Sequence, residues 1–65
     1  MQTFHIILIN IDGQIIAKGD VPFVPRIGEQ VISNERTFNV KNVIYDFGRD
    51  KQTFPINVAV RVEPM

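Results

Sequence analysis

The sequence predicts an all-β fold in which five short strands form one domain over residues 1–65. Three observations lead to this prediction. Apolar and polar residues alternate along the C-terminal segment, an Asp-Gly pair separates two β-rich runs near the N-terminus, and no segment has the 3.6-residue apolar spacing of a helix. Since a strand turns every second side chain to the same face, alternation of this kind indicates a half-buried sheet.

The first two strands are expected on either side of Asp12-Gly13, a pair typical of a two-residue turn with positive φ at both positions. Counting outward from this turn gives the pairs of the hairpin: Ile11 with Gln14, Asn10 with Ile15, Ile9 with Ile16, Leu8 with Ala17, Ile7 with Lys18, Ile6 with Gly19, His5 with Asp20 and Phe4 with Val21.

Both faces of this hairpin are apolar. The face without charge is the expected core side, and it consists of Phe4, Ile6, Leu8, Ile15, Ala17 and Val21. The other face carries Ile7, Ile9, Ile11 and Ile16, fringed by His5, Lys18 and Asp20. A ribbon of two strands does not leave four isoleucines in water without consequence, so we expect either a loop or another chain to cover them.

The segment Val21–Gly28 contains Pro22 and Pro25, which rule out a central strand and favour an extended, crossing loop. Phe23, Val24 and Ile27 give this loop apolar anchors, and it is one candidate cover for the isoleucine face. A third strand follows at residues 30–32, and Ser33–Arg36 reads as a tight turn in which Asn34 tolerates positive φ.

The fourth strand runs from Phe38 to Tyr45, and its alternation slips by one residue at Lys41-Asn42, which predicts a β-bulge. A polar turn is expected at residues 47–52. The last strand then places Phe54, Ile56, Val58, Val60 and Val62 on one face. Five short strands, a bulge and a proline-rich loop predict a small, partly open β-barrel, SH3-like in the first instance and OB-like as the alternative.

Two stretches carry a resemblance to a known group of proteins: Val24-Pro25-Arg26-Ile27-Gly28-Glu29-Gln30-Val31 and Phe38-Asn39-Val40-Lys41-Asn42-Val43. With the alternating last strand, they resemble short uncharacterised SH3-like barrel proteins of bacteria, phages and plasmids over residues 24–62. The resemblance implies the barrel fold and a phage or mobile-element setting in which small barrels act as adaptors or inhibitors. It brings no catalytic residues with it.

Length and composition limit how the protein can be stabilised and which classes of function it can have. A chain of 65 residues buries only about 60% of the surface its unfolded form exposes, so it needs a well-packed core or self-association. The absence of cysteine excludes disulfides and thiolate metal sites and fits a cytoplasmic location. No apolar run approaches the roughly 20 residues of a membrane span. Seven basic and seven acidic residues cancel, which removes the main driving force for nucleic-acid binding.

Four small groups of residues are candidate sites, and the first three have a simpler structural interpretation. His5 opposite Asp20 resembles an oriented general base, yet no nucleophile accompanies it, so a cross-strand ion pair is preferred. Among the carboxylates Glu29, Glu35, Asp46 and Asp50, the last two bracket one turn without the ligand spacing of a calcium loop, so turn capping is preferred over a metal site. Gly48 reads as a turn glycine.

The fourth constellation is a basic and aromatic set that predicts the alternative function, binding of single-stranded nucleic acid: Arg26, Lys41, Tyr45, Arg49 and Lys51, with Phe47 nearby. These residues come from three segments and are interrupted by acidic ones. The preferred prediction is therefore a non-enzymatic protein-interaction module without cofactor or metal, homodimeric through the hairpin. Its expected binding residues are Ile7, Ile9, Ile11, Ile16 and Lys18.

Overall fold

The structure is a computed structural model that describes residues 3–48, 55 and 57–65. These residues form five strands and no helix: β1 (Phe4–Ile9), β2 (Ile15–Val21), β3 (Gln30–Ser33), β4 (Arg36–Asp46) and β5 (Asn57–Pro64). The prediction of an all-β, five-stranded, partly open barrel is confirmed. The strands form a curled half-barrel, consistent with a small SH3-like or OB-like barrel.

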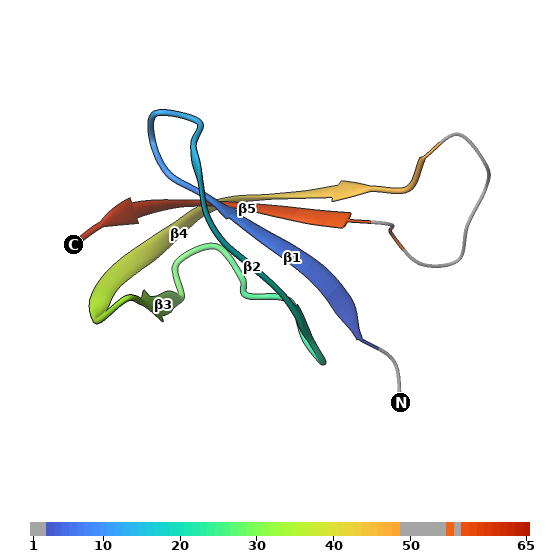
Figure 1. Cartoon of the computed structure of the whole chain (residues 1–65), viewed down its shortest axis with the longest axis horizontal. Coiled ribbons are helices and arrows are strands. Elements are labelled where there is room, and N and C mark those ends of the chain that lie inside the picture. The colour runs from blue at the N-terminus through green and yellow to red at the C-terminus, as the bar shows by residue number, and fades with distance from the viewer. Residues whose placement is uncertain (1–2, 49–54, 56) are drawn as a thin grey trace.

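The strands lie in one sheet in the order β2-β1-β5-β4-β3. Neighbours are antiparallel except β1 and β5, which run parallel with Ile6 opposite Val58 and Ile9 opposite Arg61. Figure 1 shows the sheet curling so that its two edge strands, β2 and β3, come to the same side of the β4–β5 ribbon. The half-barrel therefore remains open between β2 and β3.

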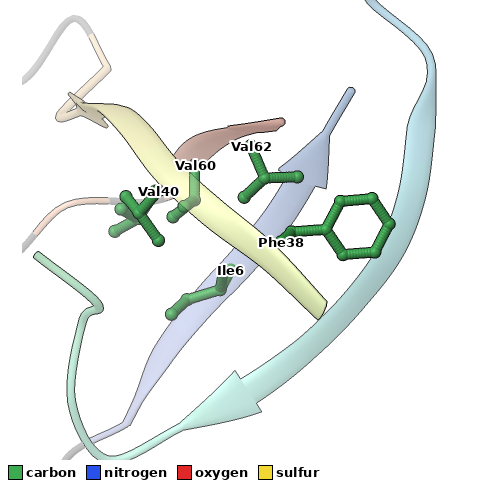
Figure 2. Packing of buried hydrophobic residues seen from close by; sticks show 6 residues of the cluster. Ile6, Phe38, Val40, Val60 and Val62 are labelled. Atoms are coloured by element: carbon green, nitrogen blue, oxygen red, sulfur yellow. The ribbon is translucent and has the colours of Figure 1, made fainter. Parts of the chain in front are cut away.

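The core is built around β5. Val58, Val60 and Val62 alternate along this strand and are at most 1% exposed, as their β-branched, period-two pattern predicts. Three further buried side chains complete the core: Ile6 from β1 and Phe38 and Val40 from β4 (Figure 2). Phe54 and Ile56, predicted for the same face, lie outside the described residues.

The β1–β2 hairpin confirms most of the predicted register, from Phe4 opposite Val21 to Leu8 opposite Ala17. Its turn differs from the prediction, because only Gly13 has positive φ, at 82°. Gly13 donates its backbone N–H to the carbonyl of Asn10 (3.1 Å), and Asn10 donates its own to the carbonyl of Gln14 (2.9 Å). The loop therefore has three residues, and the side chain of Asn10 accepts hydrogen bonds from the backbone of Asp12 and Gln14.

Because the loop is one residue longer than predicted, Ile15 and Ile16 occupy faces opposite to those predicted for them. Ile9 pairs with Ile15 instead of Ile16, and a bulge at Ile16 restores the predicted register from Leu8 onward. Ile16 consequently packs against the core, while Ile15 is 54% exposed on the opposite face. The assignment of Ile15 to the core and of Ile16 to the isoleucine face was wrong, because a shift of one residue exchanges the two faces of a strand.

Two further predictions about local geometry are confirmed. The register of β4 against β5 shifts between Val40 and Asn42, so Lys41 is the extra residue of a bulge. The turn after β3 is tight, since Ser33 pairs with Arg36 directly. Asn34 (φ 51°) and Glu35 (φ 66°) both adopt the left-handed conformation that a type I′ turn requires.

The segment between β2 and β3 covers the inner, core-side face of the sheet. Val24 packs against the core cluster, and Phe23 and Pro25 line a groove together with Ile6 and Leu8 of β1. As predicted, this proline-containing segment is not part of a strand. It does not cover the isoleucine face, because Ile6 and Leu8 belong to the opposite side of β1 from Ile7 and Ile9.

The hairpin register makes a first prediction. Ile16→Ala should lower the free energy of unfolding by about 2 kcal/mol, since it removes packing from the core. Ile15→Ala, the matched control one residue away, should change it by no more than about 0.5 kcal/mol. Urea unfolding followed by circular dichroism measures both, and an equal or reversed order would contradict the bulge at Ile16.

The β3–β4 turn makes a second prediction. Glu35→Gly should stabilise the protein by roughly 0.5–1 kcal/mol, because glycine removes the left-handed strain of an L-residue but adds chain entropy to the unfolded state. Asp12→Gly is the control, since Asp12 itself does not have positive φ and should gain nothing. Thermal unfolding of the two variants tests the turn, and an unchanged or lower midpoint for Glu35→Gly would refute it.

Candidate interaction surface

On the face of the sheet opposite the core, one row of paired residues crosses four strands, and its members on β1, β5 and β4 are apolar. Ile7 of β1 pairs with Lys18 of β2 on one side and with Ala59 of β5 on the other, and Ala59 pairs with Ile44 of β4. Directly paired residues share a face, so these side chains all point outward. The outward direction of these side chains also follows from alternation along each strand. Ile7 follows the buried Ile6, and Ala59 lies between the buried Val58 and Val60.

A second row lies next to the first. Ile9 pairs with Ile15 of β2 and with Arg61 of β5, and Arg61 pairs with Asn42 of β4. We define the outer patch as the apolar members of the two rows: Ile7, Ile9, Ile15, Ile44 and Ala59. Ile15 and Ile44 are 54% and 48% exposed, and the other three are half-buried among their neighbours. The inner segment at residues 22–29 leaves this patch open.

Charges lie at the two ends of the outer patch. Beyond the row of Ile7, the acidic end holds Asp20, paired with His5, and Asp46, paired with Asn57. At the other end Arg61 lies in the row of Ile9, and the ammonium of Lys41 lies 3.5 Å from the carboxylate of Glu63. Within the described residues, Arg61 has no carboxylate within 4.0 Å. The patch is thus acidic at one end and basic at the other.

Of the residues predicted to bind a partner, Ile7, Ile9 and Lys18 lie on the outer face. Ile11 lies in the hairpin loop and is 61% exposed, and Ile16 belongs to the core side. The prediction missed Ile15, Ile44 and Ala59. Ile44 could have been found by following the alternation of β4 beyond the bulge, whereas Ala59 depends on the strand order, which the sequence left open.

Two hollows border the sheet. The inner groove, about 290 Å³, lies between β2 and the segment at residues 22–29, and its lining is mostly apolar. The second hollow, about 320 Å³, lies beside the basic end of the outer patch and is lined by polar side chains such as Asn10, Lys41, Asn42 and Arg61. Among the described residues that line the two hollows there is no serine, threonine or cysteine.

The residues proposed for nucleic-acid binding do not come together. Arg26 lies in the segment before β3, Lys41 is paired with Glu63 at the bulge, and Tyr45 lies near the far end of β4, where the β4–β5 ribbon extends beyond the other strands (Figure 1). The ring of Tyr45 stacks on Phe47 with centroids 6.5 Å apart. Arg49 and Lys51 lie outside the described residues. The described cations therefore form no basic stripe beside the aromatic pair.

The remaining candidates have structural roles. His5 and Asp20 form the expected cross-strand pair, with Nδ1 and Oδ1 3.0 Å apart and both side chains exposed. Gly48 has φ 74° and donates its N–H to Oδ1 of Asp46 (3.0 Å), which confirms the turn-capping role. Glu29 accepts a hydrogen bond from the backbone of Arg26, and Glu35 lies in the tight turn. Asp50 lies outside the described residues.

No group of three or more metal-ligating side chains occurs in the described ranges. Those ranges also contain no helix with the length and hydropathy of a membrane span. Comparison with protein-family models, with curated proteins and with solved structures found no match for the chain.

The scattered positions of the described basic side chains predict that the protein does not bind single-stranded nucleic acid. A short labelled oligonucleotide should show no saturable binding at physiological salt, because the described basic side chains are scattered and one is already paired. Fluorescence anisotropy across a salt series measures this. Saturable binding that weakens steeply with salt and is lost on Tyr45→Ala would favour the nucleic-acid alternative instead.

Proposed function

We propose that the protein is a non-enzymatic interaction module, a small adaptor or inhibitor that binds protein through the outer patch. One observation carries this proposal: an apolar surface spans four neighbouring strands and is left open by the segment that covers the other face. Contiguous apolar surface on a small protein, rimmed by charge, is typical of a binding face.

The chemistry of the patch agrees with this role. Isoleucine side chains supply desolvation energy without hydrogen-bonding demands, and Lys18, Arg61, Asp20 and Asp46 form a polar rim that orients a partner. The function would then be performed by occlusion of the partner's surface. The phage or mobile-element setting implied by the resemblance over residues 24–62 is part of this proposal.

Strand addition is a second way in which the same module could bind. Among the described strands, β2 pairs with β1 alone, so its outer backbone groups are open to an added strand. Lys18 and Asp20 lie on this edge, and charged residues on an edge strand discourage unspecific pairing. We therefore prefer the patch over the edge as the main binding surface.

Variants on the two faces test the proposal. Ile44→Glu and Ile9→Glu should abolish the capture of protein partners by the immobilised chain, since a carboxylate in the patch must be desolvated on binding. Ile44 is the safer position, because it is half exposed and its loss leaves the core intact. Partners would be captured from a lysate of the source cells and compared quantitatively between variants by mass spectrometry.

Ile27→Glu is the matched control. Ile27 is 66% exposed in the segment on the inner face, so the same substitution adds the same charge away from the patch. Capture should survive in this variant, and circular dichroism should show all three variants folded. Capture that survives Ile44→Glu and Ile9→Glu in folded protein would overturn the proposed role of the outer patch.

A further inference from the structure

We infer that the hollow beside the basic end of the outer patch is a binding site for a carboxylate that is attached to an aliphatic group. The site is separate from the surface that carries the proposed function, because no residue of the outer patch lines it. The inference therefore goes beyond the proposed function and does not depend on it. It follows from which hydrogen-bonding groups of this polar hollow are already used and which are not.

The polar hollow lies where the bulge of β4 faces the end of β1. Asn42 of β4 pairs with Arg61 of β5, and Lys41, the extra residue of the bulge, precedes it. On the other side of β5, Arg61 pairs with Ile9, the last residue of β1, so the hairpin loop that follows with Asn10 forms the opposite wall. Because a bulge sets two residues opposite one, β4 supplies two polar side chains to the hollow where a regular strand would supply one.

The two asparagines of the hollow turn their oxygens to the backbone. Oδ1 of Asn42 accepts a hydrogen bond from the N–H of Val43 (3.0 Å), and Oδ1 of Asn10 accepts from the N–H groups of Asp12 (3.0 Å) and Gln14 (2.9 Å). Since a backbone N–H only donates, the remaining atom of each side-chain amide is the nitrogen, which is a donor. Nδ2 of Asn10 gives one of its two N–H groups to Oε1 of Gln14 (3.3 Å). In the described part of the chain, Nδ2 of Asn42 makes no hydrogen bond to a side chain.

The charged side chains leave a donor as well. The ammonium of Lys41 lies 3.5 Å from the carboxylate of Glu63, whereas the guanidinium of Arg61 has no carboxylate within 4.0 Å among the described residues. Two cations and one anion therefore line the hollow, which leaves one net positive charge. A singly charged anion complements this charge, and the planar fork of Arg61 fits the two oxygens of a carboxylate. A doubly charged phosphate fits less well, because Glu63 repels the second charge.

An apolar side chain lies beside these donors. Ile11 is 61% exposed and lines the hollow from the hairpin loop. A ligand that carries an aliphatic group next to its carboxylate would cover Ile11 while it pairs with Arg61. At about 320 Å³ the hollow is at the lower end of the range for small-molecule sites, so it fits a small acid or one terminal residue of a chain. The aliphatic C-terminal residue of a protein and a free aliphatic acid share this chemistry.

Two probes test the site and separate the two sources. N-acetyl-isoleucine represents an aliphatic C-terminal residue, and 4-methylpentanoate represents a free acid. In heteronuclear NMR at constant ionic strength, either acid should shift the backbone amides of residues 41–43 and 61–63 saturably, with a dissociation constant of roughly 1–10 mM. The probe that binds more tightly identifies the source. N-acetyl-isoleucine amide, which has the same shape without the charge, should give no saturable shift.

Two substitutions test the donors. Arg61→Gln should weaken binding by about fivefold or more, since the charge-assisted fork is lost. Asn42→Asp keeps an oxygen for the N–H of Val43 but replaces the donor amide with a negative charge, so it should abolish saturable binding. The matched control is Arg26→Gln, which removes the same charge outside the hollow and should change the dissociation constant by less than about twofold. Circular dichroism checks that each variant is folded.

Glu63→Gln is the converse test. It removes the carboxylate that faces Lys41 and raises the net charge of the hollow by one. The acid probes should then bind about two- to fivefold more tightly at low salt, and the gain should fade as salt is added. A purely structural role of Glu63 does not produce tighter binding.

Weaker binding by Arg61→Gln together with tighter binding by Glu63→Gln would support the carboxylate site. Inorganic phosphate that binds more tightly than both acids would overturn the carboxylate as the ligand. The site itself would be overturned by equal binding in Arg61→Gln and the natural sequence, or by no saturable shift at about 50 mM of either acid, well above the expected dissociation constant. None of these outcomes bears on the proposed function, which is decided by partner capture in Ile44→Glu and Ile9→Glu.

Discussion

The whole structure depends on the burial of one face of β5. Val58, Val60 and Val62 are withdrawn from solvent almost completely, and β5 is hydrogen-bonded to β1 on one side and to β4 on the other. Because side chains alternate along a strand, fixing the inner face of β5 also fixes which residues of its neighbours point outward. Ile7 and Ile44 are outward for this reason, so the outer patch follows from the same geometry that builds the core.

Local features of the fold could be predicted from the sequence because each depends on a few neighbouring residues. The bulge at Lys41, the turn at Asn34 and the alternation of β5 are of this kind. The register of β1 against β2 was predicted correctly from Leu8 onward, but from a two-residue turn that the structure does not have. The loop is one residue longer than expected, and the bulge at Ile16 offsets the difference. Asn10 and Gly13, three residues apart, carry the signal for that longer loop, since Asn favours the first position of such a turn and Gly the fourth.

The parallel pairing of β1 with β5 could not be predicted in this way. It joins strands from opposite ends of the chain, and no local pattern determines which strands become neighbours. Ala59 was therefore missed as a member of the outer patch, although it was correctly expected in a strand. The pairing also explains why the isoleucine face extends over four strands rather than two. Among the described segments, the one at residues 22–29 lies on the inner face, so it does not cover the outer patch.

The central claim is that the outer patch contacts another protein molecule, and for the homodimer that the sequence predicts, a dilution series followed by heteronuclear NMR tests it most directly. Backbone amide shifts of Ile7, Ile44 and Ala59 should change with protein concentration, while those of Val24 and Gly28 on the inner side should stay fixed. Saturating changes confined to the outer strands would confirm the account. Shifts that are independent of concentration, or that change only in the segment at residues 22–29, would contradict a homodimer through this patch.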